Sequence, residues 1–259
     1  AGGKEEGRRR NLEGSEGNVG SREGAEGSGL PDWVVTFLKG APPMVAQGVF
    51  LAPMDAMRKI RADKTTGSLT AVPYTAMVSS CTVWVAYGLL ANDPTIWLPN
   101  VSGALLGAFY LFTFASHLAP GVSLRSHYAG AALVCMCTLA SFAVLPTAQA
   151  NAAVGYIGVV LVVIMFTGPL ATIQTVIKTR STSSLPPLFT AASFLNCLLW
   201  ALYGSLVIHD PFIWGPNTAG LLASVIQISL FAAYGMPPKS PHSSTSSSVP
   251  FTHLRKSIV

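Results

Sequence analysis

The sequence predicts an all-α membrane protein of seven transmembrane helices, in which a unit of three helices occurs twice and one helix joins the two copies. Two observations predict this class. Half of the 259 residues are hydrophobic and only 10% are charged, whereas a soluble domain carries about 25% charged residues. The phrase "DPTIWLPN", which starts at Asp93, also returns as "DPFIWGPN" from Asp210.

Seven apolar runs are long enough to cross a bilayer whose hydrocarbon core is about 30 Å thick. The runs cover residues 34–57, 71–91, 94–116, 128–148, 153–177, 187–208 and 211–234. They divide the chain into a disordered N-terminal tail (1–32), a first three-helix repeat (33–117), a linker helix (118–150), a second three-helix repeat (151–235) and a disordered C-terminal tail (236–259). The tails are expected to be disordered because they are polar and poor in apolar residues.

The distribution of basic residues predicts the orientation of the spans. Lys and Arg occur in the links after the first, third and fifth spans and in the C-terminal tail, and the other links carry none. By the positive-inside rule, the C-terminus is cytosolic and the N-terminus lies outside or in a lumen. The plasma membrane is favoured as the location of this multi-pass protein, and a vacuolar or other endomembrane is the alternative.

The internal repeat extends over all three helices of each copy. The segment "PMDAMRKIRADKTTGSL" aligns with "PLATIQTVIKTRSTSSL", and "SCTVWVAYG" aligns with "NCLLWALYG", both at an offset of 116 residues. One residue is then gained, so that "DPxIWxPNxxG" returns at an offset of 117. Both copies run in the same direction through the membrane, because four crossings separate equivalent helices. A pseudo-twofold axis along the membrane normal therefore relates them, and a pore or cavity is expected on that axis.

The repeated phrase marks the start of the last helix in each copy. Asp93 and Asp210 precede a proline, as expected for a helix N-cap, and we interpret them as structural caps rather than proton carriers. Pro99 and Pro216 come later, inside the helix, where each removes a backbone donor. A loosened turn is therefore expected at both positions.

Two tryptophans and two asparagines are the expected core of a substrate site. At about 1.5 Å per residue, Trp84 lies roughly 20 Å from the cytosolic start of its span and Asn100 roughly 9 Å from the opposite start. These depths nearly coincide in a core about 30 Å thick, and the second repeat places Trp200 and Asn217 at the same level. Indoles can cover the C–H faces of a sugar, while carboxamides donate to and accept from its hydroxyls. The structural alternative is that the asparagines join helices and the tryptophans mark the membrane interface.

Ionisable side chains are scarce in the predicted spans. Only Asp55 is expected inside one, near its cytosolic end, where Arg58 and Lys59 favour a local ion pair. Ion-coupled carriers place ionisable groups within the membrane, so a neutral substrate and uncoupled transport are expected. The cysteines Cys81, Cys135, Cys137 and Cys197 lie in apolar runs without further ligands, so we expect buried free thiols and no metal. We also expect no cofactor, no enzymatic activity and no nucleic-acid partner.

Four prolines are expected near the cytosolic face: Pro53, Pro73, Pro169 and Pro186. The match of Pro186 with Pro73 requires a slip of three residues. Kinks at the same end of four helices would provide the hinges of an alternating-access gate. The alternative is that these prolines simply begin or end helices.

These motifs resemble those of the SWEET family of sugar uniporters. The resemblance covers about residues 41–235 and rests on Pro53, "SLTAVPY", "WVAYG" and "PNVSG", followed by Pro169, "TRSTSSLP", "WALYG" and "PNTAG". It implies facilitated, bidirectional movement of mono- or disaccharides by alternating access. It also implies that Trp84, Asn100, Trp200 and Asn217 line the sugar pocket and that the four prolines serve the gates. A homo-oligomer is a possible assembly, because members of the family tend to self-associate.

Four further pocket positions implied by the resemblance bear on the size of the sugar. Val49 and Ser80 resemble the roomier, sucrose-type members, whereas Met165 and Asn196 resemble the tighter, hexose-type ones. Larger side chains shrink a cavity, so hexose is the preferred expectation. The alternative function is export of another small solute, such as an amino acid, as in the wider Pro-Gln loop superfamily.

Overall fold

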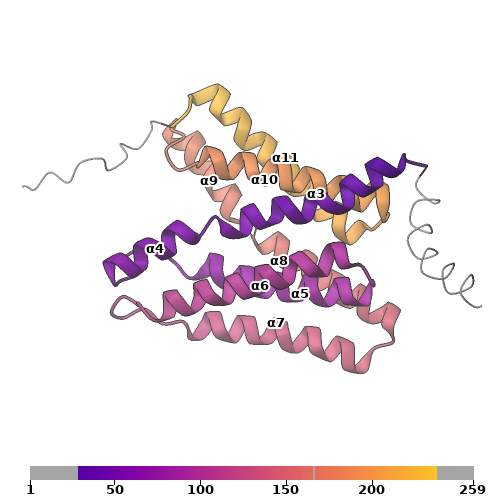
Figure 1. The fold of residues 1–259 in the computed structure, drawn as a ribbon. Helices are drawn as coiled ribbons and strands as arrows, with labels where there is room; N and C mark the ends of the chain where they lie inside the picture. The colour runs from indigo at the N-terminus through magenta and orange to yellow at the C-terminus, as the bar shows by residue number, and fades with distance from the viewer. Residues whose placement is uncertain (1–28, 166, 238–259) are drawn as a thin grey trace, which may run out of the picture.

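The computed structural model describes residues 29–165 and 167–237, and every regular element within them is helical (Figure 1). The elements are α3 (Asp32–Leu51), α4 (Met54–Asp63), α5 (Val72–Leu90), α6 (Pro94–Ala115), α7 (Arg125–Val144), α8 (Thr147–Met165), α9 (Thr167–Thr179), α10 (Pro187–Leu202), the π-helical turn η1 (Tyr203–Val207) and α11 (Pro211–Tyr234). The predicted all-α class is confirmed. Nearly all of the two predicted polar tails lies outside the described residues.

Six helical segments in the described part of the chain are long and apolar enough to cross a membrane. They are Asp32–Asp63, Pro94–Ala115, Arg125–Val144, Thr147–Thr179, Pro187–Val207 and Pro211–Tyr234. The remaining predicted span is α5, which has 19 residues but is less apolar. Its position explains this composition, because α5 packs against α6, α7 and α8 and buries Thr75 and Ser79 among them. The chain is thus an integral, multi-pass membrane protein.

Equivalent helices of the two repeats make equivalent contacts. Within the repeats, α5 packs against α6 and α10 packs against α11. Between the repeats, α3 packs against α10 and α8 packs against α5. The linking helix α7 covers α5 and α8, and Figure 1 shows α9, α10 and α11 gathered on one side of the molecule and α5, α6 and α7 on the other. This arrangement is the predicted order of three, one and three helices.

The predicted boundary between the fourth and fifth spans is wrong by several residues. The fourth span was expected to run to residue 148, but α7 ends at Val144 and α8 already begins at Thr147. Leu145 is extended, with φ −99° and ψ 147°. It precedes Pro146, whose ring disfavours the helical conformation of the residue before it.

One of the predicted spans is interrupted at a proline. The first span breaks between α3 and α4, where Pro53 is the N-cap of α4. In the fifth span, residue 166 lies outside the described residues, and Pro169 lies in the first turn of α9. A proline cannot donate a hydrogen bond to the preceding turn. Pro73 and Pro186 instead begin helices, as the alternative interpretation expected. Among the four prolines, Pro53 therefore marks an interruption, in the described part of the chain, that could serve as a hinge.

The residue gained by the second repeat is absorbed in η1. A π-helical turn contains one residue more than the turn of an α-helix. Because of this wide turn, the Asp210 amide donates to the Gly204 carbonyl at 2.7 Å, just as the Asp93 amide donates to the Gly88 carbonyl at 2.8 Å. The insertion thus leaves the capping aspartate in the same place relative to its glycine in both copies.

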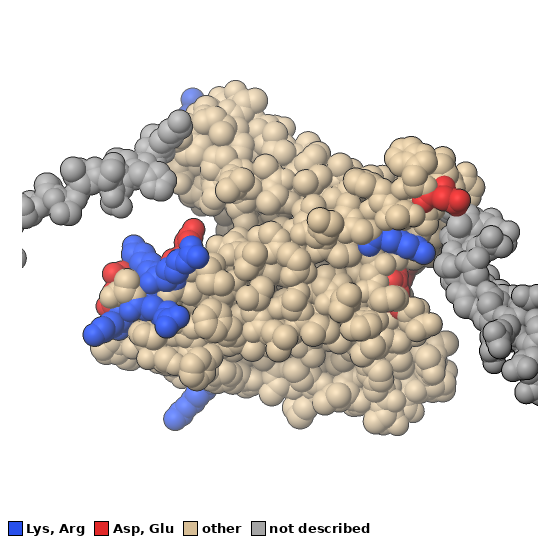
Figure 2. All heavy atoms as spheres, in the orientation of Figure 1, with Lys and Arg blue, Asp and Glu red and all other residues tan. Residues whose placement is uncertain are grey.

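The two ends of the helical bundle differ in charge. We call one the basic end, because α4 carries Arg58, Lys59 and Arg61, and Figure 2 shows Lys and Arg side chains gathered at this end. The opposite end carries Asp93 and Asp210, and we call it the acidic end. Helix α3 begins at the acidic end and α11 finishes at the basic end (Figure 1).

Tyr110 of α6 holds the break between α3 and α4. Its side chain is fully buried, and its hydroxyl donates to the backbone carbonyl of Phe50 at 3.0 Å. The last carbonyl groups of an α-helix have no partner within the helix, so this bond supplies a donor where α3 is interrupted. Tyr110 therefore ties the possible hinge to α6.

Replacing Tyr110 by phenylalanine is expected to destabilise the protein, because the Phe50 carbonyl loses its buried donor. Leaving a buried acceptor unpaired costs about 1–3 kcal/mol. Thermal unfolding of the purified protein in detergent measures the effect. Tyr128→Phe is the control, since the Tyr128 side chain is 48% exposed. Equal stability of the two variants would show that the bond to Phe50 contributes nothing.

Candidate functional site

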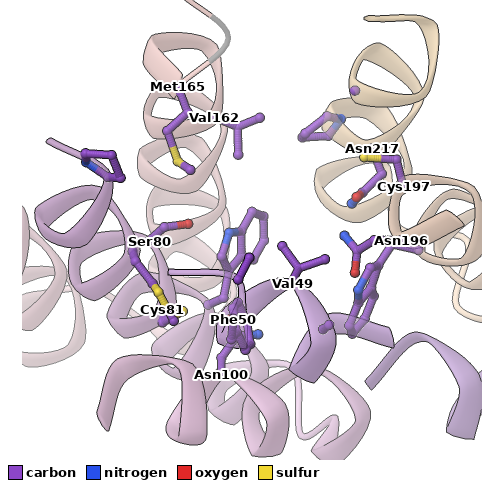
Figure 3. Close-up of a pocket in the computed structure, with 18 of the residues that line it drawn as sticks. Val49, Phe50, Ser80, Cys81, Asn100, Val162, Met165, Asn196, Cys197 and Asn217 are labelled. Carbon is purple, nitrogen blue, oxygen red and sulfur yellow. The ribbon is translucent and has the colours of Figure 1, made fainter. Parts of the chain in front are cut away.

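A cavity of about 420 Å³ lies between the two repeats and receives side chains from α3, α5, α6, α8, α10 and α11 (Figure 3). All eight residues predicted to bind substrate line it: Trp84, Asn100, Trp200, Asn217, Ser80, Asn196, Val49 and Met165. These side chains come from six helices that lie far apart in the sequence. The structure brings them together at one chamber.

The chamber presents no charged side chain. None of its lining residues, in the part of the chain that the structure describes, is Asp, Glu, Lys, Arg or His. One expectation about charge is nevertheless wrong, since Lys39 lies inside α3 together with the apolar residues of that span. Lys39 is exposed and does not line the chamber. The chamber is therefore suited to a neutral molecule.

Each tryptophan of the chamber packs against a tyrosine one turn further along its helix. The rings of Trp84 and Tyr87 are 5.5 Å apart at 80°, and those of Trp200 and Tyr203 are 5.9 Å apart at 81°. Edge-to-face pairs of this kind are favourable aromatic contacts. On the other repeat, Gly158 lets α8 approach Trp84, because a Cβ atom there would lie 3.0 Å from the indole. Both indoles are therefore held in place at the chamber wall.

Asn100 and Asn217 each fold back on their own helix. The Asn100 amide nitrogen donates to the Ile96 carbonyl and the Asn217 amide nitrogen to the Ile213 carbonyl, both at 2.8 Å. The neighbouring prolines interrupt neither helix, since α6 and α11 continue through them, and the expected loosening of these turns stays a prediction. Each carboxamide keeps its oxygen and a second N–H for other partners.

The remaining four predicted residues make the two halves of the chamber unequal. Ser80 in the first repeat faces Asn196 in the second, and Val49 is matched by Met165 (Figure 3). The second repeat therefore supplies the larger side chains. The side-chain oxygen of Asn196 is buried and accepts no hydrogen bond within the described structure. An unpaired buried acceptor is costly, so a ligand hydroxyl would be a favourable partner for it.

Two hydrogen bonds between the repeats close the acidic end. The Tyr87 hydroxyl donates to Asp210 Oδ2 at 2.5 Å, and the Tyr203 hydroxyl donates to Asp93 Oδ2 at 2.6 Å. The two bonds are equivalent under the pseudo-twofold symmetry and run in opposite directions between the repeats. Around them, a buried apolar cluster that includes Val83, Val154 and Leu199 fills the space.

The predicted capping role of the two aspartates is confirmed. Asp93 Oδ1 accepts from the Thr95 amide and Asp210 Oδ1 accepts from the Phe212 amide, both at 2.9 Å. Each carboxylate thus uses one oxygen as a helix cap and the other to hold a tyrosine of the opposite repeat. Sequence reasoning identified the first role and missed the second. A signal for it was present, because both repeats contain a tyrosine before the glycine of "WVAYG" and "WALYG".

The basic end is open. A second hollow of about 600 Å³ lies there and shares Val49, Ala52 and Phe189 with the chamber. Figure 2 shows the molecule hollowed beside the basic side chains of α4. Asp55 and Arg58 line this hollow and form the predicted local ion pair, with 2.8 Å between Oδ1 and Nη1. A small molecule can therefore reach the chamber from this end.

The predicted gating prolines take different places around this opening. Pro53 and Pro73 line the chamber itself, whereas Pro186 lines the hollow at the basic end. Pro169 lies in the first turn of α9. The structure thus brings three of the four prolines to the path between the chamber and the basic end.

Comparison with known proteins identifies the family. The family described as "Sugar efflux transporter for intercellular exchange" matches residues 41–119 and again residues 152–239. Sugar transporter SWEET1 of Drosophila pseudoobscura pseudoobscura is 31% identical over 194 residues, which are 74% of this chain and 84% of that protein. Bidirectional sugar transporter SWEET5 of Arabidopsis thaliana is 30% identical over 200 residues, 74% of this chain and 82% of the relative.

A solved structure agrees with these relatives. The structure of a eukaryotic SWEET transporter superposes with a TM-score of 0.70 at 26% identity and covers 77% of this chain and 96% of its own. The chain therefore belongs to the SWEET family of sugar transporters.

Proposed function

We propose that this chain is a uniporter that carries neutral sugars, preferably hexoses, across a membrane in both directions by alternating access. The observation that carries the proposal is the uncharged chamber between the repeats, to which the repeats contribute the equivalent pairs Trp84 with Asn100 and Trp200 with Asn217. The names of its relatives, sugar transporter and bidirectional sugar transporter, support the same function.

The chamber suits a sugar in size and chemistry. Its volume of about 420 Å³ falls in the range of roughly 300–1,000 Å³ that is typical of small-molecule sites. The indoles of Trp84 and Trp200 would cover apolar C–H faces, while Asn100 and Asn217 would bond to the hydroxyls. The preference for hexoses is supported by the larger side chains of the second repeat, which narrow its half of the chamber.

The arrangement of gates supports alternating access. In the described conformation sugar would enter from the basic end, while the Tyr87–Asp210 and Tyr203–Asp93 bonds keep the acidic end shut. Each chamber tryptophan touches one of these tyrosines, so sugar on the indole would act directly on the closed gate. Movement at the break in the first span would then close the basic end. We propose residues 33–117 and 151–235 as the moving units, with 118–150 as their linker.

We further propose that the basic end faces the cytosol, because positively charged links stay on the cytosolic side of the membrane during insertion. The protein would then be open to the cytosol in the described conformation. The plasma membrane is the favoured location, and a homo-oligomer stays a prediction.

Transport by the purified chain in proteoliposomes tests the function. Labelled glucose is expected to equilibrate across the membrane at the same rate with and without a pH gradient, and faster than sucrose. Unlabelled glucose inside the vesicles should accelerate entry of the label, as expected for a bidirectional carrier. The reason is that no Asp, Glu, Lys, Arg or His side chain lines the described chamber to couple protons to the sugar.

Two outcomes would overturn the proposal. Accumulation of glucose above its external concentration under a pH gradient would show proton coupling. Flux of a labelled amino acid in the absence of glucose flux would favour the alternative, an exporter of another small solute. Empty liposomes provide the baseline for both measurements.

A further inference from the structure

Two cysteines lie in the wall of the chamber at equivalent positions of the repeats. Cys81 follows Ser80 on α5, and Cys197 follows Asn196 on α10. Both thiols are free, and the proposed sugar contacts do not involve them. The other two cysteines, Cys135 and Cys137, lie on α7 and do not line the chamber.

The two chamber thiols differ in accessibility. Cys81 is only 3% exposed, and its sulfur packs so tightly on α6 that a Cβ atom at Gly103 would lie 2.6 Å from it. Cys197 is partly exposed. It lies one turn before Trp200 on α10 and, like that residue, lines the chamber. Cys197 is therefore the thiol that a molecule in the chamber can reach.

We propose that Cys197 is a thiol-modification site inside the transport path, at which a small thiol-specific electrophile blocks the passage of sugar. An adduct on its sulfur occupies part of a chamber of about 420 Å³. Because residues three apart share a helix face, the adduct lies beside the Trp200 indole. The block of flux rests on the proposed transport function, whereas the modification itself does not.

A methanethiosulfonate is the appropriate probe. The Cys197 thiolate attacks the sulfenyl sulfur of the reagent, so a disulfide bond forms and the bond to the sulfonyl group breaks. Methanesulfinate leaves, and the thiol proton passes to water. The thiolate is the reacting form, so the reaction requires water at the thiol. The hollow of about 600 Å³ at the basic end supplies this access, since it joins the chamber at Phe189.

The charged 2-sulfonatoethyl methanethiosulfonate makes the experiment specific for the water-filled path. It does not enter the hydrocarbon core, so Cys137, although exposed on α7, should not react. Mass spectrometry of the treated protein is expected to find the adduct on Cys197. Glucose flux is expected to fall in proportion to the labelled fraction, and glucose in the medium should slow the labelling.

Two variants serve as matched comparisons, each measured against its own untreated flux. Cys197→Ser should lose the sensitivity to the reagent, whereas the double variant Cys135→Ser/Cys137→Ser should keep the sensitivity of the wild type. If the serine variant folds poorly, Cys197→Ala and the glucose-protected labelling of the wild type give the same test.

The outcomes separate the inference from the proposed function. An unlabelled Cys197, or a Cys197→Ser variant as sensitive as the wild type, overturns the inference. Labelling of Cys197 in a chain that carries no sugar leaves the modification site standing and contradicts the proposed transport. Labelling only from the side that carries the basic end supports the described access route.

Discussion

Replacing Trp200 by alanine is expected to reduce glucose flux roughly 10- to 100-fold, because burial of an aromatic side chain is worth about 1.5–3 kcal/mol. The variant loses the indole at the chamber wall and also the edge-to-face contact with Tyr203. The proposed sugar-binding surface and the contact with Tyr203, whose hydroxyl helps to close the acidic end, are therefore lost together. Initial rates of glucose entry into proteoliposomes, measured at several glucose concentrations, give the size of the effect.

Trp214→Ala is the matched control for this prediction. Trp214 belongs to the repeated phrase in α11, but its side chain is 40% exposed and does not line the chamber. Its removal should leave glucose entry close to that of the wild type. Equal loss of flux in both variants would mean that the chamber indole has no special role. Asn217→Ala is expected to behave like Trp200→Ala, because it removes a carboxamide from the same chamber.

Replacing Gly204 by valine is expected to prevent the second repeat from packing correctly. A Cβ atom at Gly204 would lie 2.7 Å from the Trp214 backbone nitrogen and 2.9 Å from the Ile213 side chain. Backbone cannot yield as a flexible side chain does, and overpacking costs about 1–3 kcal/mol or more. The displaced segments also carry Tyr203 and Asp210, so the two tyrosine–aspartate bonds that close the acidic end should be lost. Thermal unfolding in detergent and glucose flux measure the two consequences.

Gly215→Val provides the comparison, since a Cβ atom at Gly215 meets nothing within 4 Å. It should unfold near the wild-type temperature and retain flux. Gly88→Val should repeat the Gly204 defect in the first repeat, because a Cβ atom there would lie 2.7 Å from the Trp97 backbone nitrogen. A stable, active Gly204→Val protein would show that this close approach is not required.

The internal repeat made much of the site predictable from sequence. Two diverged copies that retain the same tryptophan and asparagine restrict which side chains can surround a shared axis, and the structure places Trp84 and Asn217 at one cavity. Whether these residues lie at one depth in the membrane stays a prediction. The helix boundary near Pro146 was misplaced by a few residues, because the mixed segment "PTAQAN" that starts at Pro146 does not show by composition where one helix ends and the next begins.

The crossed tyrosine–aspartate bonds could not be derived from spacing. Tyr87 and Asp210 lie in different repeats, and their approach depends on how α5 and α11 pack in three dimensions. The capping role of Asp210 was predictable because it depends on the next two residues alone. The unequal exposure of Cys81 and Cys197 likewise comes from packing, since the two thiols hold equivalent places in the repeats.

The crossed bonds have a consequence for the kinetics of the cycle. Both bonds cross the interface between the two repeats. Each joins a hydroxyl to a carboxylate, and a hydrogen bond of this kind contributes about 1.5–3 kcal/mol. Separating the halves breaks the two together, because Tyr203 and Asp210 belong to one half and Tyr87 and Asp93 to the other. Breaking one bond alone would strain the bond that remains. The acidic end should therefore open in an all-or-none step, with few molecules in a half-open state.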